Sequence, residues 1–370
     1  MLRTDIGRAV AEINEQALIQ NYQRLHAFAA AHSNHVRPRT IAVVKANAYG
    51  HGFLHTVPPL LRAGCRFFAV ATLCEALAVR RYAPNADILI LGYTDPRAAK
   101  TLSHYRLTQT VFSEEYAQDL AKFATVSGCF VKIHLKIDVG MCRLGFAPTD
   151  LCALCRTATL PHLLPCGLFT HFPKADSDAA ATHAAFCRFL ACRRALQERG
   201  FRLFSHAAAS AALLKLPYTV LDGVRVGLAL YGIPPVKTAL PLQPVLSLRA
   251  PVIQIHRIAA GTSVGYGGAF VATRPSKIGI LPIGYGDGLP RRFEKSVVTV
   301  RVFHQNTAFL APVAGHICMD MMALDLTDTP IEVGDHALLF DDPRPVARAL
   351  DTIPWEILTS LHPRIFRKRR

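Results

Sequence analysis

Short runs of β-branched and aromatic residues alternate with longer, helix-patterned stretches through about the first 240 residues of the chain. In the longer stretches, such as EEYAQDLAKFATVSG, apolar residues recur every three or four positions, which is the spacing of an amphipathic helix. The strand-like runs begin near residues 40, 66, 87, 107, 130, 166, 202 and 219. Eight strand–helix units are what a TIM-type (β/α)8 barrel requires. We therefore predict an α/β fold with such a barrel over residues 1–242.

The pattern changes at about residue 243, where strand-like runs follow one another between Gly, Pro and Asp residues. This change predicts a smaller, mostly β C-terminal domain over residues 243–370, with the boundary in the proline-bearing stretch GIPPVKTALPLQP. A helix is expected in TIPWEILTSL near the end. The leading segment reads as a strand and a helix that precede the barrel, or as the closing helix of the barrel.

Composition excludes some classes of function. The formal charge of +16 is spread along the chain, and only the tail RIFRKRR is concentrated, so we expect a solvated basic end and no specific nucleic-acid partner. No apolar run reaches the 18 residues of a membrane span, and the N-terminus lacks an apolar export signal. Ten cysteines fit a reducing compartment, so we expect a cytoplasmic protein. Cys152 and Cys155 form a lone CxxC pair, which we interpret as core filler and not as a metal site.

The stretch AVVKANAYGHG, residues 42–52, ends an apolar strand on Lys45. A lysine in apolar surroundings must be paired, exposed or neutral, and at most strand ends it simply reaches solvent. The alternative is a desolvated, nucleophilic amine that binds an aldehyde. Other predicted barrel strands also end on polar residues, and the chemistry of this fold lies at those ends. These residues are Asp138 with Arg143, His171, Ser210 and Arg225.

Taken together and in this order, the motifs resemble those of the alanine racemase family, pyridoxal-phosphate enzymes with an α/β barrel and a C-terminal β domain. AVVKANAYGHG is similar to the family's cofactor-lysine motif, which implies that Lys45 binds pyridoxal 5'-phosphate. LKIDVGMCRLGF carries Arg143, which by resemblance holds the substrate, and Lys136, which is carbamylated in some members. FTHFPKAD carries His171, and GVRVGLALYG carries Arg225, which implies a bond to the pyridine nitrogen. In the second domain the matching segments SVGYGGAF, GYGDG and GHICMDM present Tyr266, Tyr285, Met319 and Asp320.

The resemblance implies racemisation of alanine by two bases, because one base on one face tends to return the original enantiomer. Lys45 would serve the D-face, and Tyr266 of the partner subunit in a homodimer would serve the L-face. A phenol with an ordinary pKa near 10 is a poor base at neutral pH, so neighbours must favour its phenolate. His171 and Arg225 resemble the family pair that forms this relay.

By the same resemblance the cofactor phosphate lies among Tyr49, Ser210, Gly227 and Leu228. The substrate carboxylate would meet Arg143 and the backbone of Met319. The product would supply D-alanine for peptidoglycan, or the reaction would allow alanine catabolism.

Two positions depart from the family pattern. Ala209 stands where the HxxNS segment commonly has Asn, and Pro363 stands where many members carry a tyrosine that touches the phosphate. Both changes remove hydrogen bonds, so we expect looser binding of the cofactor. Three alternatives remain: a racemase of serine, lysine or arginine, a decarboxylase of similar plan, and a non-catalytic pyridoxal-phosphate carrier.

Overall fold

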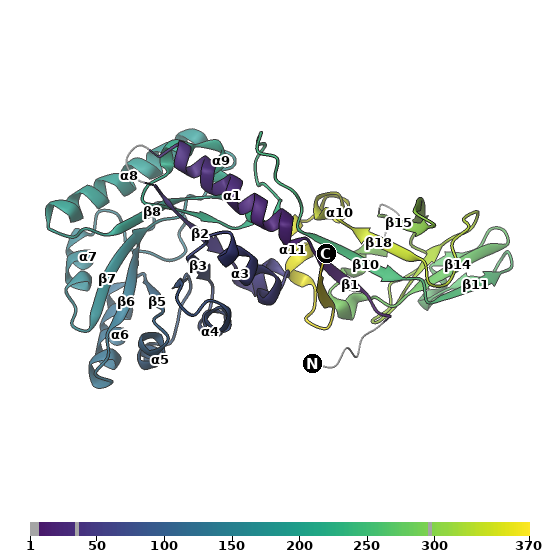
Figure 1. The fold of residues 1–370 in the computed structure, drawn as a ribbon, viewed down its shortest axis with the longest axis horizontal. Helices are drawn as coiled ribbons and strands as arrows, with labels where there is room; N and C mark the ends of the chain where they lie inside the picture. Colours follow the sequence, from purple (N-terminus) through teal and green to yellow (C-terminus); the bar gives the residue numbers. More distant parts are fainter. Residues whose placement is uncertain (1–6, 34–36, 295–297) are drawn as a thin grey trace. The chain divides into compact units, whose positions relative to one another are not determined.

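The computed structural model describes residues 7–33, 37–294 and 298–370, in which the chain forms two compact units (Figure 1). The barrel unit comprises Gln16–Ala48 and Thr56–Gln243, and the β unit comprises Met1–Glu15, Tyr49–His55 and Pro244–Arg370. The β unit therefore includes the leading strand of the chain and the short segment Tyr49–His55, which begins four residues after Lys45.

In the described part of the barrel unit, eight parallel strands close on themselves, because β9 pairs with β2. The predicted (β/α)8 barrel is confirmed. The strands are β2 (Arg39–Val43), β3 (Phe67–Val70), β4 (Asp87–Ile90), β5 (Thr108–Val111), β6 (Val131–Lys136), β7 (Leu163–Phe169), β8 (Phe204–Ala209) and β9 (Gly223–Val226). β3, β5 and β9 are buried along their whole length, as expected of a parallel sheet covered by helices.

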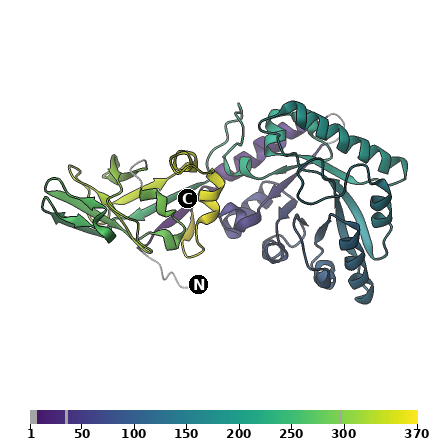
Figure 2. The same cartoon turned by 180° about the vertical axis from the view of Figure 1, so that it is seen from behind.

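Helices surround these strands, as Figure 1 shows for α5 to α8, and the view from behind in Figure 2 shows the same outer layer. They are α1 (Glu15–Ala31), α3 (Phe53–Arg62), α4 (Leu73–Tyr82), α5 (Ala99–His104), α6 (Glu114–Val126), α7 (Leu151–Ala158), α8 (Ala179–Glu198) and α9 (Ser210–Lys215). Several begin at a side-chain cap that accepts a backbone N–H of the first turn, among them Thr72 before α4 and Ser113 before α6. These caps fix where each strand-to-helix loop ends.

The β unit is built mainly of strands, as predicted. Within the described residues its largest sheet has the order β16-β15-β18-β10-β1-β19, and two smaller sheets have the orders β11-β14-β17 and β12-β13. The strands are β1 (Val10–Ile13), β10 (Leu246–Pro251), β11 (Gln254–Ile258), β12 (Ser263–Val264), β13 (Phe270–Val271), β14 (Ser276–Leu281), β15 (Thr299–His304), β16 (Thr307–Pro312), β17 (Met322–Asp325), β18 (His336–Phe340) and β19 (Phe366–Arg369). Two helices complete this unit, α10 (Pro343–Ala349) and the predicted α11 (Pro354–Ser360).

The leading strand β1 lies in the sheet of the β unit, where it pairs antiparallel with β10 and parallel with β19. The leading segment therefore supplies a strand to the β unit and then α1, whose residues from Gln16 on belong to the barrel unit. The basic tail forms β19 beside β1, and most of its side chains are exposed, as expected of a solvated end. Lys368 Nζ lies 3.0 Å from a Glu12 oxygen, and Arg367 donates to the carbonyl oxygens of Leu361, His362 and Ile365. Much of the concentrated positive charge is thus used within the fold.

Cys152 is exposed, which corrects its interpretation as core filler, whereas Cys65 and Cys192 are buried. None of the helices in the described ranges has both the length and the apolar character that crossing a membrane requires.

Candidate active site

Lys45 lies one residue beyond Val44, just after the end of β2, and is half-buried. Burial lowers the pKa of its amine, and the positive charge of Arg143 lowers it further, against the opposing effect of Glu75. The strand therefore ends on an amine that loses its proton more readily than an ordinary lysine. A neutral amine is the nucleophilic form, which favours the second interpretation of this residue.

The segment after Lys45 makes one turn in the left-handed conformation. Ala46, Asn47, Ala48 and Tyr49 all have φ between 49° and 58°. Such a turn costs roughly 1–2 kcal/mol per non-glycine residue and persists only where the surroundings enforce it. The Ala48 N–H donates to Val44 O over 2.8 Å, and the Ala46 N–H donates to Glu75 Oε1 over 2.6 Å. These bonds hold the strained backbone around the lysine.

A second group lies at the end of β6. Lys136 is buried, and desolvation, followed by the charges of Arg143 and Arg225, lowers its pKa to about 8. Asp138 accepts the backbone N–H groups of Gly140, Met141 and Arg143 over 2.7–3.0 Å. Burial raises the pKa of this carboxyl, but the backbone hydrogen bonds outweigh it and the pKa is lowered. Asp138 thereby fixes the loop that carries Arg143.

Arg225 on β9 is buried, and its terminal N–H groups are all used. Nη1 donates to His206 Nδ1 over 2.7 Å and to His206 O over 2.9 Å, while Nη2 donates to Thr170 O over 2.6 Å and to Ala207 O over 3.0 Å. The fifth donor, Nε–H, has no acceptor in the ranges that the structure describes. Burial lowers the pKa of Arg225 to about 9, so the guanidinium remains charged at neutral pH.

His206 and His134 continue the hydrogen bonds of Arg225 through the barrel interior. Neither histidine is among the site residues predicted from the sequence. His206 Nδ1 accepts from Arg225, so in the neutral ring Nε2 carries the proton and donates to His134 Nδ1, 3.0 Å away. Burial lowers the pKa of His134 to about 3 and lowers that of His206 well below its ordinary value, which keeps both rings neutral. A usable signal was present, because His134 and Lys136 share one face of β6.

His171 follows β7, next to Thr170. Burial, and then the charges of Arg225 and other cations, lowers its pKa to about 3. Among the described residues the expected pair is not directly bonded, since no hydrogen bond joins His171 to Arg225 and the partner of Arg225 is His206. The two side chains interact here through charge.

Ser210 and Leu228 begin two short helical segments at neighbouring strand ends. Ser210 is the first residue of α9, and Leu228 opens the 3₁₀ turn Leu228–Tyr231. The Gly227 N–H donates to Ser210 Oγ over 3.1 Å, which brings these two segments together. Amides at helix starts lack intrahelical acceptors and suit an anion such as a phosphate. Ala209 caps α9 without a side-chain hydrogen bond, as expected from the departure at this position.

The β unit carries the remaining predicted residues. Tyr266, Tyr285 and Cys318 line a cavity of about 450 Å³ together with Arg291, His316 and Ile317. Tyr266 stands between glycines of positive φ, and its side chain is 74% exposed. Met319 and Tyr285 are exposed as well. A large aromatic and apolar surface of this kind is typical of a binding or contact region.

The predicted site residues thus form two groups. The barrel unit holds Lys45, Lys136, Arg143, His171, Ser210, Arg225, Gly227 and Leu228, and the β unit holds Tyr49, Tyr266, Tyr285, Met319 and Asp320. The barrel group combines a readily deprotonated amine, a buried cation with a spare donor and a set of amides suited to an anion. These groups fit a phosphorylated pyridine aldehyde: the amine suits the aldehyde, the spare donor suits the pyridine nitrogen, and the amides suit the phosphate.

Two family models match the chain, described as alanine racemase, N-terminal domain, over residues 13–235 and alanine racemase, C-terminal domain, over residues 245–369. "Alanine racemase 2" of Caldanaerobacter subterraneus subsp. tengcongensis is 34% identical, covering 96% of this chain and 92% of the relative. The alanine racemase of Desulfovibrio desulfuricans is 36% identical and covers 96% of both. A crystal structure of alanine racemase from Bacillus anthracis with bound L-Ala-P is 29% identical, with a TM-score of 0.89 over 98% of this chain and 95% of that one.

Proposed function

The chain belongs to the alanine racemase family and interconverts L-alanine and D-alanine, and from this premise we propose that it does so with pyridoxal 5'-phosphate held by Lys45. The observation that carries the cofactor proposal is the buried Arg225, whose Nε–H is left without an acceptor in the described part of the chain. A pyridine nitrogen is an acceptor of the kind that this donor lacks.

The remaining cofactor contacts follow from the donor set. The Ser210 hydroxyl and the Leu228 amide would face the phosphate, with Tyr49 from the loop after Lys45, and Gly227 would support them through its N–H bond to Ser210 Oγ. Lys45 would hold the cofactor at its aldehyde group, since burial and Arg143 keep the Lys45 amine easy to deprotonate. When bound, pyridoxal phosphate takes up the electron pair that remains at Cα after the proton leaves.

Two bases on opposite faces move the Cα proton. Lys45 Nζ would accept or return the proton on one face. Tyr266 Oη serves the other face, from the partner subunit of a homodimer. The wide exposure of Tyr266, Met319 and Tyr285 supports this dimer, because an active-site surface left open in one chain is available to a second copy.

Arg225 sets the electronic character of the site. Its guanidinium stays protonated at neutral pH, so it donates to the pyridine nitrogen without transferring a proton. His206, itself bonded to His134, accepts from Arg225 and keeps the guanidinium plane oriented. An unprotonated ring withdraws fewer electrons, which favours quick return of a proton to Cα over side reactions.

Arg143 and the Met319 N–H meet the substrate carboxylate. Lys136, with its pKa near 8, offers enough neutral amine to react with carbon dioxide. The resulting carbamate would place a negative charge beside Arg143. We assign this carbamylation to Lys136 as part of the proposal, and the enzyme to the cytoplasm, where its free cysteines stay reduced.

The test is the chirality of alanine after incubation of the purified protein and pyridoxal phosphate with L-alanine in deuterated water, next to the Lys45→Ala variant. We expect Cα-deuterated D-alanine with the unmodified protein alone. If L-alanine stays unchanged while the protein still shows cofactor absorbance, the substrate assignment fails and L-serine, L-lysine and L-arginine are the next substrates. Equal activity of Lys45→Ala would refute the assignment of the cofactor lysine.

A further inference from the structure

The backbone turn that carries Met319 is held from two sides inside the β unit. The Cys318 N–H donates to Met321 O over 2.9 Å, which closes the turn. The loop after β14 pairs with it, since the Tyr285 N–H donates to Cys318 O over 3.1 Å and the Gly286 N–H donates to Met319 O over 2.8 Å. The Met319 N–H itself donates to no group within the described residues, so it is available to a ligand.

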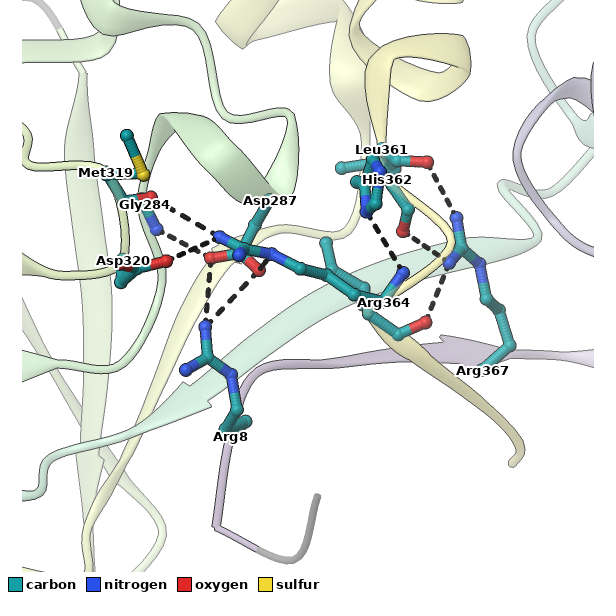
Figure 3. Close-up of polar contacts among 10 residues, drawn as sticks. Arg8, Gly284, Asp287, Met319, Asp320, Leu361, His362, Arg364 and Arg367 are labelled. Carbon is teal, nitrogen blue, oxygen red and sulfur yellow. Dashed lines mark hydrogen bonds and ion pairs between the residues drawn. The ribbon is translucent and has the colours of Figure 1, made fainter. Parts of the chain in front are cut away.

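Arg364 binds the exposed side of the same turn (Figure 3). Its Nη2 donates to Asp320 Oδ1 over 2.9 Å and lies 3.4 Å from Met319 O. Its Nε donates to Asp287 Oδ1 over 2.6 Å. One guanidinium thereby connects the two residues at the tip of the turn to a carboxylate on the neighbouring loop.

Asp287 gives Arg364 a fixed anchor. Its side chain is only 2% exposed, and it also accepts the Gly284 N–H over 2.9 Å. Arg8 Nη2 approaches both carboxylate oxygens at 3.3 and 3.4 Å from another direction, as Figure 3 shows. A buried carboxylate bonded by a backbone N–H and two guanidiniums has little freedom to rotate. The guanidinium of Arg364 is therefore held by Asp287 through Nε as well as by Asp320 through Nη2.

The backbone near this anchor leaves little room for adjustment. A Cβ on Gly284 would overlap the carbonyl oxygens of Cys318 and Met319, and a Cβ on Gly286 would lie 2.6 Å from Arg364 Nη2. The His362 N–H donates to Asp287 O over 2.9 Å, which fixes the segment that carries Arg364. Three chain segments far apart in sequence therefore meet at one point.

We propose that Arg364 is a positioning residue for racemisation, which orients the Met319–Asp320 turn so that the Met319 N–H meets the substrate carboxylate. This inference rests on the proposed contact between Met319 and the substrate. Arg364 touches the turn and not the reacting atoms, so it acts through Met319. Displacing that N–H by about 1 Å weakens a carboxylate contact on the order of tenfold to a hundredfold.

Arg8 provides a matched control. The Arg8 and Arg364 side chains are each 36% exposed, and each forms an ion pair with the same buried carboxylate. In the described structure only Arg364 also reaches the Met319–Asp320 turn. Arg8→Gln and Arg364→Gln each remove one cation from Asp287, so a purely structural effect would appear in both variants.

The experiment compares the full-length holoenzyme with these two variants by thermal midpoint, by kcat and KM for L-alanine, and by amide hydrogen exchange of the peptide 316–323. We expect both variants to lower the thermal midpoint by similar amounts. Only Arg364→Gln should raise KM about tenfold or more, with a smaller change in kcat, and speed exchange in the turn. The milder Arg364→Lys, which keeps the charge at Asp287, should recover stability but not the low KM.

Equal KM values in the two glutamine variants, or unchanged exchange in Arg364→Gln, would overturn the inference. Faster exchange with an unchanged KM would also overturn it and would remove Met319 from the substrate contacts, while leaving the racemase assignment intact. An unmodified protein that leaves alanine unchanged would refute the proposed function instead. The exchange comparison would then decide by itself whether Arg364 holds the turn.

Discussion

Gly50, in the loop directly after Tyr49, is a position where a single methyl group should disturb this protein. Its φ is +81°, a region that side chains rarely adopt, and a Cβ built there would overlap Leu358 O and lie 3.0 Å from the Leu358 carbonyl carbon. Gly261 offers a matched control in the same unit, with φ of +83° and no atom within 4 Å of the added carbon. The two substitutions share the backbone strain and differ in the overlap.

The expected sizes follow from these two effects. Gly261→Ala should lower the free energy of unfolding by about 1–2 kcal/mol, from the left-handed backbone alone. Gly50→Ala should add about 1–3 kcal/mol, because the overlapped group is backbone in α11 and cannot turn away as a side chain can. The backbone shift at Gly50 should also weaken cofactor binding, because Tyr49, which we place at the cofactor phosphate, is the residue before it. Gly50 O also accepts from Arg367 Nε over 3.1 Å, and the shift would disturb this bond.

The assay is urea denaturation of both variants, followed by the fluorescence of Trp355. This is the only tryptophan in the sequence, and it lies in α11, the helix that contains Leu358. Far-UV circular dichroism should give the same midpoints if the transition is two-state. If Gly50→Ala loses no more stability than Gly261→Ala, the close approach of Gly50 to Leu358 does not limit this site and the reasoning is refuted.

Three further outcomes are expected. Because burial keeps His134 and His206 neutral in the folded state, the unfolded chain binds more protons as pH falls below about 6.5. For His134 stability should drop by about 1.4 kcal/mol per pH unit down toward its folded-state pKa of about 3, and His206, whose pKa is also lowered, should add to this loss. Urea midpoints against pH test this, and a slope unchanged in His134→Gln would contradict it. Mixing the inactive Lys45→Ala and Tyr266→Phe proteins should restore part of the activity, and failure despite demonstrated heterodimers would argue against shared sites. Arg225→Glu should increase transamination per racemisation, measured as pyruvate formed per D-alanine, and an unchanged ratio would remove the electronic role given to this residue.

Local sequence determined much of this protein. The alternation of strand-like apolar runs with helix-patterned stretches predicted the eight barrel strands, because both patterns are set by residues close together in sequence. The stretch AVVKANAYGHG left open whether Lys45 reaches solvent or binds an aldehyde, and its resemblance to the family's cofactor-lysine motif implied the second. In the structure the pKa of Lys45 is lowered. The pattern did not reveal the left-handed turn from Ala46 to Tyr49, because this backbone is enforced by contacts such as the one from Ala46 to Glu75.

Only the tertiary structure decided which distant segments meet. The pattern of β1 indicates a strand but does not identify its partners, β10 and β19. This pairing depends on how the whole chain folds, because the fold brings the N-terminal strand beside strands near the C-terminus. The pairing of the basic tail was hidden for the same reason, since the partner of Lys368, Glu12, is more than 350 residues away in sequence. His206 next to Arg225, and Arg364 between Asp287 and Asp320, likewise arise from strand order and loop packing. Residue type therefore determined the available chemistry, whereas chain closure over long separations determined which groups act together.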